Sequence, residues 1–385
     1  MKLFITTLFA VYFVITALLL GVDITTAIVE RYSHFHMGHW SDQHAWQKAV
    51  QKICAKWAIK TPILRLKKDC RYILLDRIRG TYGKRMVQSW QKAGCVLGLQ
   101  EAGIDKITPQ VKAQLLNSEG SWKTPVNKID YGMIAYALLK AEQNPNAIRR
   151  AMDSMVQCIE SNLCTDGLVS YSGGKDSTRR YVDTLGFVCP FLALYGKVYH
   201  KPEYITLAID QLRLFHSHGM IQGLPVHCFQ SGSGFPIGVC GWGRGTSWYA
   251  LGLIDLYSEL DNKGDKEIVK PWIEEVACIC LGFERHDGGF STILPAQNVY
   301  DSSATAVLGY FYAKCGAIFH ENKYTQVAIR CRNRLIKVTK MNGVVDECQG
   351  DTIDIGIFSE RYAPMPFAQG MALRLAAVLD QTIEE

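Results

Sequence analysis

One short pattern recurs in the connectors of this chain and narrows the folds that it can adopt. A polar residue and a glycine precede apolar residues at Asp166-Gly167, Gln222-Gly223, Asp287-Gly288 and Asn342-Gly343. The four glycines lie 56, 65 and 55 residues apart, a period that fits two helices with their loops. We therefore expect stacked helical hairpins, arranged either as an open solenoid or as a closed ring. Closure is favoured because the connectors are long, glycine-rich and aromatic, as the rim of a shared pocket would be.

The segments between these connectors have apolar residues at helical spacing, and few segments alternate as strands do. The predicted helices cover residues 41–60, 84–102, 127–142, 146–162, 182–199, 203–216, 246–260, 266–283, 302–315, 324–339 and 364–381. The chain has 385 residues, 48% of them hydrophobic, which is enough for a large core in one or two domains. The expected fold class is all-α, a toroid of helical hairpins whose repeated loops share a cleft at one end.

The N-terminal segment differs in composition from the rest. An uncharged run extends from Leu3 to Val22, between Lys2 and Asp23, and twenty such residues can cross a bilayer as a helix. The same run fits a long signal peptide. We expect residues 1–30 to form an anchor or signal segment, residues 31–80 a connector, and residues 81–385 the helical barrel. Attachment through residues 3–22, or export, would place the barrel outside the cytoplasm, although the many unpaired cysteines weigh against export.

The charge balance points away from a nucleic-acid partner. The net charge is only +6, and much of the excess lies between Lys60 and Arg85. No known nucleic-acid motif accompanies this basic run. A solvated face, or a patch near anionic lipid, is the preferred interpretation.

Cysteine and histidine usage does not indicate a metal centre. Thirteen cysteines leave at least one thiol without a partner in the chain. Cys95, Cys189, Cys278 and Cys315 are on apolar helical faces, where cysteine behaves as a small hydrophobe. Four histidines between His34 and His44 match no carboxylate-supported motif. We expect no metal site here, and the oligomeric state is left open.

The stretch from His227 to Leu260 is the first candidate binding element. A glycine-rich loop delivers Trp242, Arg244 and Trp248 to the start of an apolar helix. A helix start adds free N–H donors and a partial positive charge, so this combination suits a sugar ring that carries a carboxylate. A structural loop with two packing tryptophans explains the residues equally well.

Two carboxylates are candidates for acid–base chemistry. Asp183 and Asp130 each open a very apolar helix. Burial would raise their pKa values, whereas Arg180 or a helix N-terminus would lower that of Asp183. A carboxyl poised between these influences can act as general acid and base, and two on neighbouring helices could face one pocket. The alternative is that each merely caps its helix. No phosphate-loop, dinucleotide or serine-hydrolase motif is present.

Four segments together resemble one enzyme family. They are Tyr181-Val-Asp183-Thr-Leu-Gly-Phe-Val-Cys-Pro190, Trp242-Gly-Arg244-Gly-Thr-Ser-Trp248-Tyr, the stretch from Asp287-Gly-Gly-Phe to Asp301-Ser302-Ser303, and Gln369-Gly370. In order and spacing they are similar to the unsaturated glucuronyl and rhamnogalacturonyl hydrolases, glycoside hydrolase families 88 and 105. The resemblance extends from about Lys84 to the C-terminus, and the first 80 residues have no clear counterpart.

This resemblance implies an (α/α)6 barrel and a hydration reaction. The substrates would be oligosaccharides whose non-reducing end is a 4,5-unsaturated uronic acid left by a polysaccharide lyase. The enzymes hydrate the C4=C5 vinyl ether, and the product rearranges and releases the sugar. Asp183 matches the general acid/base and Asp130 the second acid. No metal or organic cofactor is implied.

The resemblance also assigns substrate-binding residues. His227 falls where the family has a pocket histidine, Trp242 and Trp248 would stack on the sugar, and Arg244 would shape or charge the pocket. Ser247 is predicted to bind substrate with them, although the family often has a glycine and a polar residue at the positions of Thr246-Ser247.

Two other functions stay open at this point. A catalytically degraded barrel could serve as a carbohydrate-binding or assembly protein at a membrane, but the presence of both aspartates, the histidine and the arginine counts against it. A different (α/α)6 enzyme is the second alternative, such as an ordinary glycosidase or a polysaccharide lyase that uses His227 with Tyr249.

Overall fold

The computed structural model describes residues 1–62, 73–79, 89–297, 299–352 and 354–384. Its helices are α1 (Lys2–Phe35), α2 (Gln43–Ile59), α3 (Ile73–Ile78), α4 (Ser89–Glu101), α5 (Thr108–Leu115), α6 (Tyr131–Lys140), α7 (Arg149–Ser161), α8 (Asp183–Val198), α9 (Pro202–His218), α10 (Gly243–Glu259), α11 (Lys263–Leu281), α12 (Ser302–Phe319), α13 (Asn322–Lys337) and α14 (Pro366–Glu384). Its strands are β1 (Arg179–Tyr181), β2 (Met220–Ile221), β3 (Leu224–Gln230), β4 (Pro236–Cys240), β5 (Cys348–Gln349) and β6 (Tyr362–Ala363). The predicted all-α class is confirmed.

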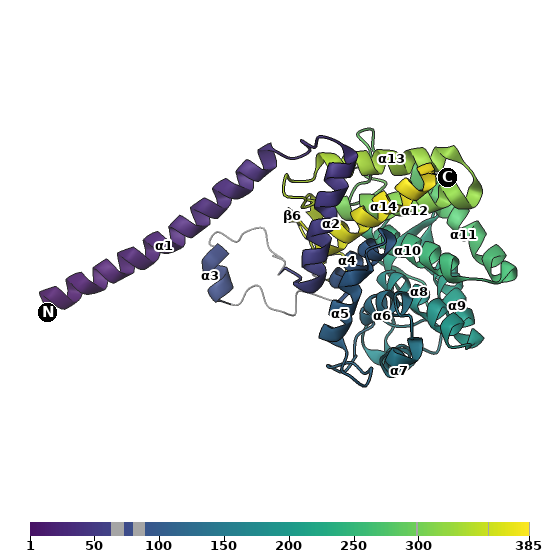
Figure 1. Cartoon of the computed structure of the whole chain (residues 1–385). Helices are drawn as coiled ribbons and strands as arrows, with labels where there is room; N and C mark the ends of the chain where they lie inside the picture. The colour runs from purple at the N-terminus through teal and green to yellow at the C-terminus, as the bar shows by residue number, and fades with distance from the viewer. Residues whose placement is uncertain (63–72, 80–88, 298, 353, 385) are drawn as a thin grey trace.

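The inner helices form a closed ring (Figure 1). α4, α6, α8, α10, α12 and α14 each pack on the next helix, and α14 packs on α4 to complete the circle. α2, α5, α7, α9, α11 and α13 lie outside this ring. The expected (α/α)6 barrel is therefore confirmed, and the open solenoid is wrong.

The two sets of helices differ in composition for a physical reason. α8 is buried continuously from Thr184 to Gly196, because it has neighbours on every side. The outer helix α7 buries only one stripe, at Ala151, Met152, Met155, Val156, Cys158 and Ile159. A helix that is apolar all round belongs inside a core, and an amphipathic one belongs on its surface.

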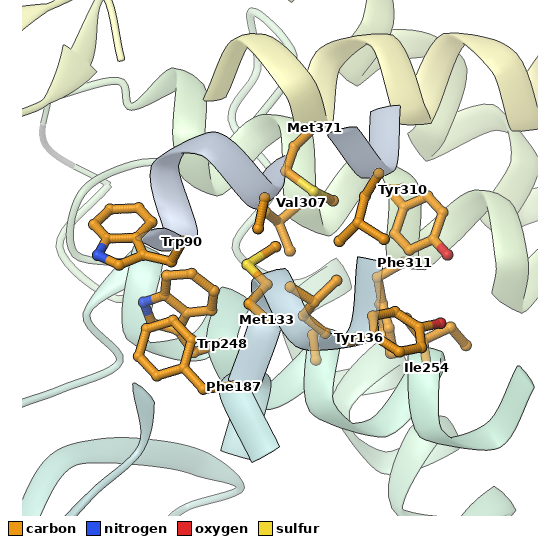
Figure 2. Packing of buried hydrophobic residues seen from close by; sticks show 14 of the residues in the cluster. Trp90, Met133, Tyr136, Phe187, Trp248, Ile254, Val307, Tyr310, Phe311 and Met371 are labelled. Carbon is orange, nitrogen blue, oxygen red and sulfur yellow. The ribbon is translucent and has the colours of Figure 1, made fainter. Parts of the chain in front are cut away.

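Side chains from all six inner helices meet in the centre of the ring (Figure 2). They include Trp90, Met133, Phe187, Trp248, Val307 and Met371, one from each helix in order. All six are at most 3% exposed. The interior of the ring is thus a packed core and not a channel.

The polar–glycine pattern marks turns that follow the outer helices. Gly167, Gly223, Gly288 and Gly343 have φ values of +82°, +75°, +85° and +88°, in the left-handed region that glycine adopts without strain. The repeat is confirmed as a structural one. A fifth turn of the same kind contains Gly120, with φ +74°. Sequence reasoning missed it because Ser121, and not an apolar residue, follows the glycine.

A small sheet and a hairpin cover one end of the ring. β3 pairs antiparallel with β1, β2 and β4, and β5 pairs with β6. β1 runs directly into α8, and β4 is followed by α10. The sheet therefore fixes the ends of two inner helices.

The segment predicted as a connector contributes to the barrel. α2 packs against α4 and α14, and Trp46, Val50, Cys54 and Ala58 are fully buried there. Barrel packing thus takes in residues 43–59, ahead of the predicted boundary at residue 81. The basic run beyond α2 made these residues look separate in the sequence. Most of that run, at residues 63–72 and 80–88, lies outside the described residues, as does the start of the helix predicted at 84–102.

The N-terminal apolar run forms most of α1, which projects away from the barrel (Figure 1). By length and composition α1 could cross a membrane, and many of its large apolar side chains are exposed. α3 packs beside it, and the Leu74 backbone N–H donates to the Asp23 carboxylate at 3.0 Å. The cysteines of the described residues are free. Most are buried as predicted, but Cys278 is exposed, on the outer helix α11.

Ring closure gives the first prediction. A Cβ added at Gly98 of α4 would collide with the Gly370 backbone of α14. The variant Gly98→Ala should therefore lose on the order of 3 kcal/mol of stability, measured by urea unfolding followed by circular dichroism. Gly282→Ala is the control, since its Cβ would lie 3.5 Å from the Ile279 carbonyl, an ordinary contact. Equal unfolding midpoints for the two variants would contradict the close approach.

Candidate active site

A pocket of about 240 Å³ opens at the end of the ring where α8 and α10 begin. Five of the predicted site residues line it: Asp183, His227, Trp242, Arg244 and Trp248. Trp90 of α4 and Tyr171, which precedes β1, complete the wall on the barrel side. The structure thus brings together residues from four separate segments of the chain.

Strand pairing places Asp183 beside His227. Tyr181 of β1 is opposite Cys228 of β3, and the Val182 N–H donates to the His227 carbonyl at 3.1 Å. The next residue, Asp183, begins α8 at that point. Its Oδ2 lies 3.7 Å from His227 Nε2, which is longer than a hydrogen bond.

The Asp183 carboxyl has the properties of a group that can exchange a proton near neutral pH. Its side chain is 18% exposed, and Oδ2 has no hydrogen-bond partner among the described residues. Burial raises its pKa to about 6, although its own backbone N–H and the charge of Arg244 oppose the change. Arg180 does not take part, because it forms an ion pair with Asp166 at 2.9 Å.

His227 is held neutral. Burial and the nearby charge of Arg244 lower its pKa to about 4. Its ring lies against Trp242, with centroids 4.6 Å apart, and Nδ1 has no hydrogen-bond partner within the described part of the chain. A neutral imidazole in this position can donate one hydrogen bond and accept another.

Asp130 stands next to this pocket but is not among the residues that line it. It is the N-cap residue of α6, yet its side chain makes no capping hydrogen bond, so the capping interpretation is wrong for it. The side chain is 2% exposed, and burial raises its pKa to about 6, helped by the charge of Asp351. Burial raises the pKa of Tyr171, and the charges of Asp130 and Asp183 add to this rise, so the two acids act on one side chain of the pocket wall.

Two tryptophans form the aromatic wall. The Trp242 indole N–H donates to the Gln349 side-chain oxygen at 3.0 Å. Trp248 packs against Phe187 and Trp90, with ring centroids 4.7 and 5.4 Å away (Figure 2). Their orientations are thus fixed before any ligand arrives, which favours stacking on a sugar ring.

Arg244 holds a loop in place. Its two Nη groups donate to the backbone carbonyls of Gln349 and Gly350 at 2.6 and 2.7 Å, and it is 1% exposed. These carbonyls begin the β5–β6 loop, residues 350–352 and 354–361. The predicted role of shaping the pocket therefore fits the geometry better than that of an open positive charge.

The structure does not bring Ser247 to the pocket. Ser247 is fully buried in α10, and its hydroxyl donates to the Gly243 carbonyl at 2.8 Å. This bond to the preceding turn of the same helix occupies the hydroxyl inside the core, and Ser247 is not among the residues that line the pocket. Closeness in the sequence to Trp242 and Trp248 is therefore not enough to place Ser247 in the pocket.

Sequence reasoning missed the β5–β6 loop. Asp351, Thr352, Asp354 and Ile355 line the pocket, yet this segment has no helical period. The available signal was the pair Gln349-Gly350, another polar residue followed by glycine. Tyr171, shortly after the predicted turn at Gly167, was missed as well.

Among the described residues, no group of three or more histidine, cysteine or carboxylate side chains is arranged to hold a metal ion. Of the four clustered histidines, His34 lies 3.6 Å from the Asp346 carboxylate.

The sequence of the barrel matches a family of known enzymes. A model of the family described as Glycosyl Hydrolase Family 88 matches residues 102–379, a range that contains every predicted site residue. The chain belongs to glycosyl hydrolase family 88. The expected relationship to these glycosidases is thereby confirmed. A search of curated proteins found no match.

Solved structures share the family 88 barrel at low sequence identity. A possible GH105-family member from Salmonella enterica serovar Paratyphi A is 19% identical, with a TM-score of 0.70 over 89% of this chain and 96% of that one. An unsaturated glucuronyl hydrolase from Bacillus sp. GL1 is 16% identical, with a TM-score of 0.62 over 87% and 96%. One specific for heparin is 15% identical, with a TM-score of 0.65 over 88% and 98%. These likenesses establish the fold.

The burial of Asp130 makes a prediction about stability. The pKa of Asp130 is higher in the folded chain than the ordinary 3.8. The contribution of this carboxyl to folding stability is therefore fully present below about pH 4 and is lost as the pH rises through about 6. Asp130→Asn should be more stable than wild type at pH 7.5, by up to about 3 kcal/mol, and equal to it near pH 4.

Thermal unfolding across this pH range measures the difference. Asp166→Asn serves as the control of opposite sign, since the hydrogen bonds from Arg180 and Ser231 hold the Asp166 pKa below its usual value against the effect of burial. Asp166→Asn should be less stable than wild type by the largest amount at neutral pH, and the difference should shrink in acid. A constant difference between Asp130→Asn and wild type would contradict the buried, uncompensated carboxyl.

Proposed function

We propose that this protein removes a 4,5-unsaturated uronic acid from the non-reducing end of oligosaccharides that polysaccharide lyases produce. The observation that carries the proposal is Asp183, a part-exposed carboxyl with a pKa of about 6 at the mouth of an aromatic pocket. Two unsaturated glucuronyl hydrolases have a similar fold, one from Bacillus sp. GL1 and one specific for heparin, and this likeness supports the substrate class.

The reaction is a hydration. Protonated Asp183 gives its proton to C4, and the positive charge that forms at C5 is shared with the ring oxygen. Water then adds to C5 while the Asp183 carboxylate accepts one of its protons, which restores the acid. The hemiketal formed at C5 opens, and the sugar at the reducing side is released. A vinyl ether accepts a proton readily, so the proposal includes no metal or organic cofactor.

Other residues position the reactants. Neutral His227, 3.7 Å from Asp183 Oδ2, can hold a water molecule or a sugar hydroxyl beside that oxygen. Asp130 is the second acid, and it acts through its charge on the part of the pocket wall that Asp183 also influences. Trp242 and Trp248 present ring faces or edges to the sugar.

The alternatives fit less well. One structural neighbour, at 16% identity and a TM-score of 0.60, is a polysaccharide lyase. The tyrosine that such chemistry would use here, Tyr249, is fully buried, and its hydroxyl is hydrogen-bonded to His216 Nδ1 at 2.8 Å. A degraded binding protein would have no need of a carboxyl whose pKa is raised toward neutrality.

The catalytic role of Asp183 is tested by replacing it. Wild type should consume unsaturated disaccharides, seen as loss of the ultraviolet absorbance of the double bond, with kcat/KM falling as the pH rises above about 6 because the acid loses its proton. Asp183→Asn should lose at least about 10³-fold in rate and stay folded.

The control is Ser247→Ala, which removes a hydroxyl inside α10 and should keep most of the activity. Incorporation of solvent deuterium at C4 separates hydration from direct displacement. Binding of pectic and glycosaminoglycan disaccharides without any loss of absorbance would favour the binding protein, and a gain of absorbance on intact polysaccharide would favour the lyase.

We further propose that α1 attaches the barrel to a membrane, on its periplasmic or extracellular side. The support is the apolar run at residues 3–22 and its exposure in the structure. The full chain should sediment with membranes and resist extraction by carbonate, whereas a chain that lacks residues 1–30 should be recovered in the soluble fraction with unchanged activity. If the protein expressed from the full sequence is recovered in the soluble fraction and has lost its N-terminal segment, that segment is a cleaved signal.

A further inference from the structure

The exposed apolar side chains of the barrel gather at one of its ends. Beyond α1, seven large apolar side chains are exposed among the described residues. Two of them are Ile78 of α3 and Ile268 of α11. The other five lie in connections that lead from an outer helix to the next inner helix, and we call them the apolar rim: Ile221, Phe235, Val299, Met341 and Ile357. Within the described chain, the connections at the opposite end contain none. Single exposed apolar residues are ordinary, but their confinement to one end is not.

The apolar rim borders the mouth of the pocket. α8 and α10 begin at the pocket, so the connections from outer to inner helices lie on that side of the ring. The Ile357 N–H donates to the carbonyl of Asp354, which lines the pocket, at 3.0 Å. Phe235 lies in the turn between β3 and β4, and Gly238 of β4 lies against Ile355, another lining residue.

α1 joins the barrel at this same end. The Gly38 N–H and the Trp40 indole N–H donate to the Thr339 carbonyl, at 3.0 and 3.3 Å. His34 lies 3.6 Å from the Asp346 carboxylate. Thr339 and Asp346 belong to the α13–α14 connection, which also holds two residues of the apolar rim. The helix that could cross a membrane therefore leaves the barrel from the edge that surrounds the pocket (Figure 1).

The part of α1 beyond the uncharged run keeps an apolar face. Ile24, Ile28, Tyr32 and Phe35 are exposed, and their spacing of four, four and three residues puts them on one side of the helix. From Asp23 to Phe35 the helix rises about 18 Å, of which a lipid headgroup layer takes up about 5–8 Å. Tilting of α1 shortens the remaining distance between the barrel and the lipid.

The loops of the apolar rim suit a lipid surface in their charge as well. Residues 228–239, which include the β3–β4 turn, contain no charged side chain, and neither do residues 341–345. Their tips, Phe235 and Met341, are 68% and 60% exposed. An apolar side chain on an uncharged loop enters the boundary between headgroups and acyl chains without the cost of dehydrating a charge.

We propose that the apolar rim docks on the surface of the bilayer that α1 crosses, so that the pocket opens toward the lipid headgroups. This inference rests on the proposed attachment through α1. A few apolar tips bind lipid weakly by themselves. Once α1 holds the barrel at the membrane, the effective concentration of the rim at the surface is high, and weak contacts are enough to set the orientation.

The first measurement locates the rim of the full-length protein in bilayer nanodiscs. The parent is Cys70→Ser/Cys278→Ser, because Cys278 is exposed and Cys70 lies outside the described residues. Phe235→Cys and Met341→Cys, labelled with a fluorophore, should lose most of their emission to a nitroxide-bearing lipid, since docked tips lie about 5–10 Å into the boundary layer. Ile268→Cys is the control, an exposed apolar position near the start of α11 at the opposite end, and should keep its emission.

The second measurement asks whether the tips cause the docking. A label at Ile357→Cys should be quenched by the same lipid. Phe235→Asp/Met341→Asp should abolish that quenching, because two carboxylates would have to enter the boundary layer. Ile268→Asp should leave it unchanged. All of these positions are exposed, so circular dichroism should show the same folded state for each variant.

The outcomes separate docking from anchoring. If the chain resists carbonate extraction but the labels at Phe235→Cys and Met341→Cys emit as the label at Ile268→Cys does, the anchor stands and this inference fails. If the chain is recovered soluble and shortened, the anchor fails. This inference then stands if that protein binds phosphatidylcholine–phosphatidylglycerol vesicles and Phe235→Asp/Met341→Asp abolishes the binding, and otherwise it fails too. A rim shielded from the lipid quencher, with a doubled protein mass per nanodisc, would identify a second copy as the occupant and overturn the inference.

Discussion

Arg374 of α14 reaches across the interior of the ring and forms a bidentate ion pair with Asp255 of α10, at 2.6 and 2.8 Å, while its Nε donates to Glu101 of α4 at 3.0 Å. All three groups are buried or nearly so, and an unpaired charge left there would cost about 3–5 kcal/mol. Helices from opposite parts of the ring are thus held in one arrangement. Asp255 lies twelve residues along α10 from Gly243, about 18 Å at 1.5 Å per residue. The ion pairs therefore hold the ring together well below the pocket, and loops can form the open end without being needed to hold the helices in place.

That open end contrasts with the interior in how its charges are treated. In the interior, the charges at the centre of the ring are paired: Arg374 contacts Asp255 and Glu101, and Tyr310 donates to Asp255. At the mouth, Asp130 is buried and Asp183 is partly buried, and one oxygen of each has no partner in the described structure. Natural chains leave polar groups unpaired mainly where function requires it. The two carboxyls whose pKa values burial raises to about 6 therefore cost stability at neutral pH, which is a physical mark of this site.

Sequence patterns predicted the helices, the turn glycines and the ring, because periodicity and left-handed turns are local properties. They also pointed to Asp183 and the two tryptophans, through residue types that are unusual at or near helix starts, and the family resemblance added His227. They could not show that Ser247 is buried within α10 and absent from the pocket lining, since that depends on the rotation of α10 within the ring. Nor could they assign the β5–β6 loop, whose position is set by hydrogen bonds from Arg244, more than a hundred residues earlier. Contacts between residues so far apart in the chain leave no periodic pattern in the sequence.

The circular arrangement has a consequence for the order in which the protein can be built. α14, the last helix of the chain, supplies the neighbours of α4 and α2, whose residues precede it by more than 260 positions. During synthesis the first helices must therefore wait with apolar faces uncovered until nearly the whole chain has emerged. Such long-range closure slows folding and exposes intermediates to aggregation. The apolar faces of the early helices of this barrel therefore stay uncovered for longer during synthesis than those of an open repeat protein, whose neighbours are close in the sequence.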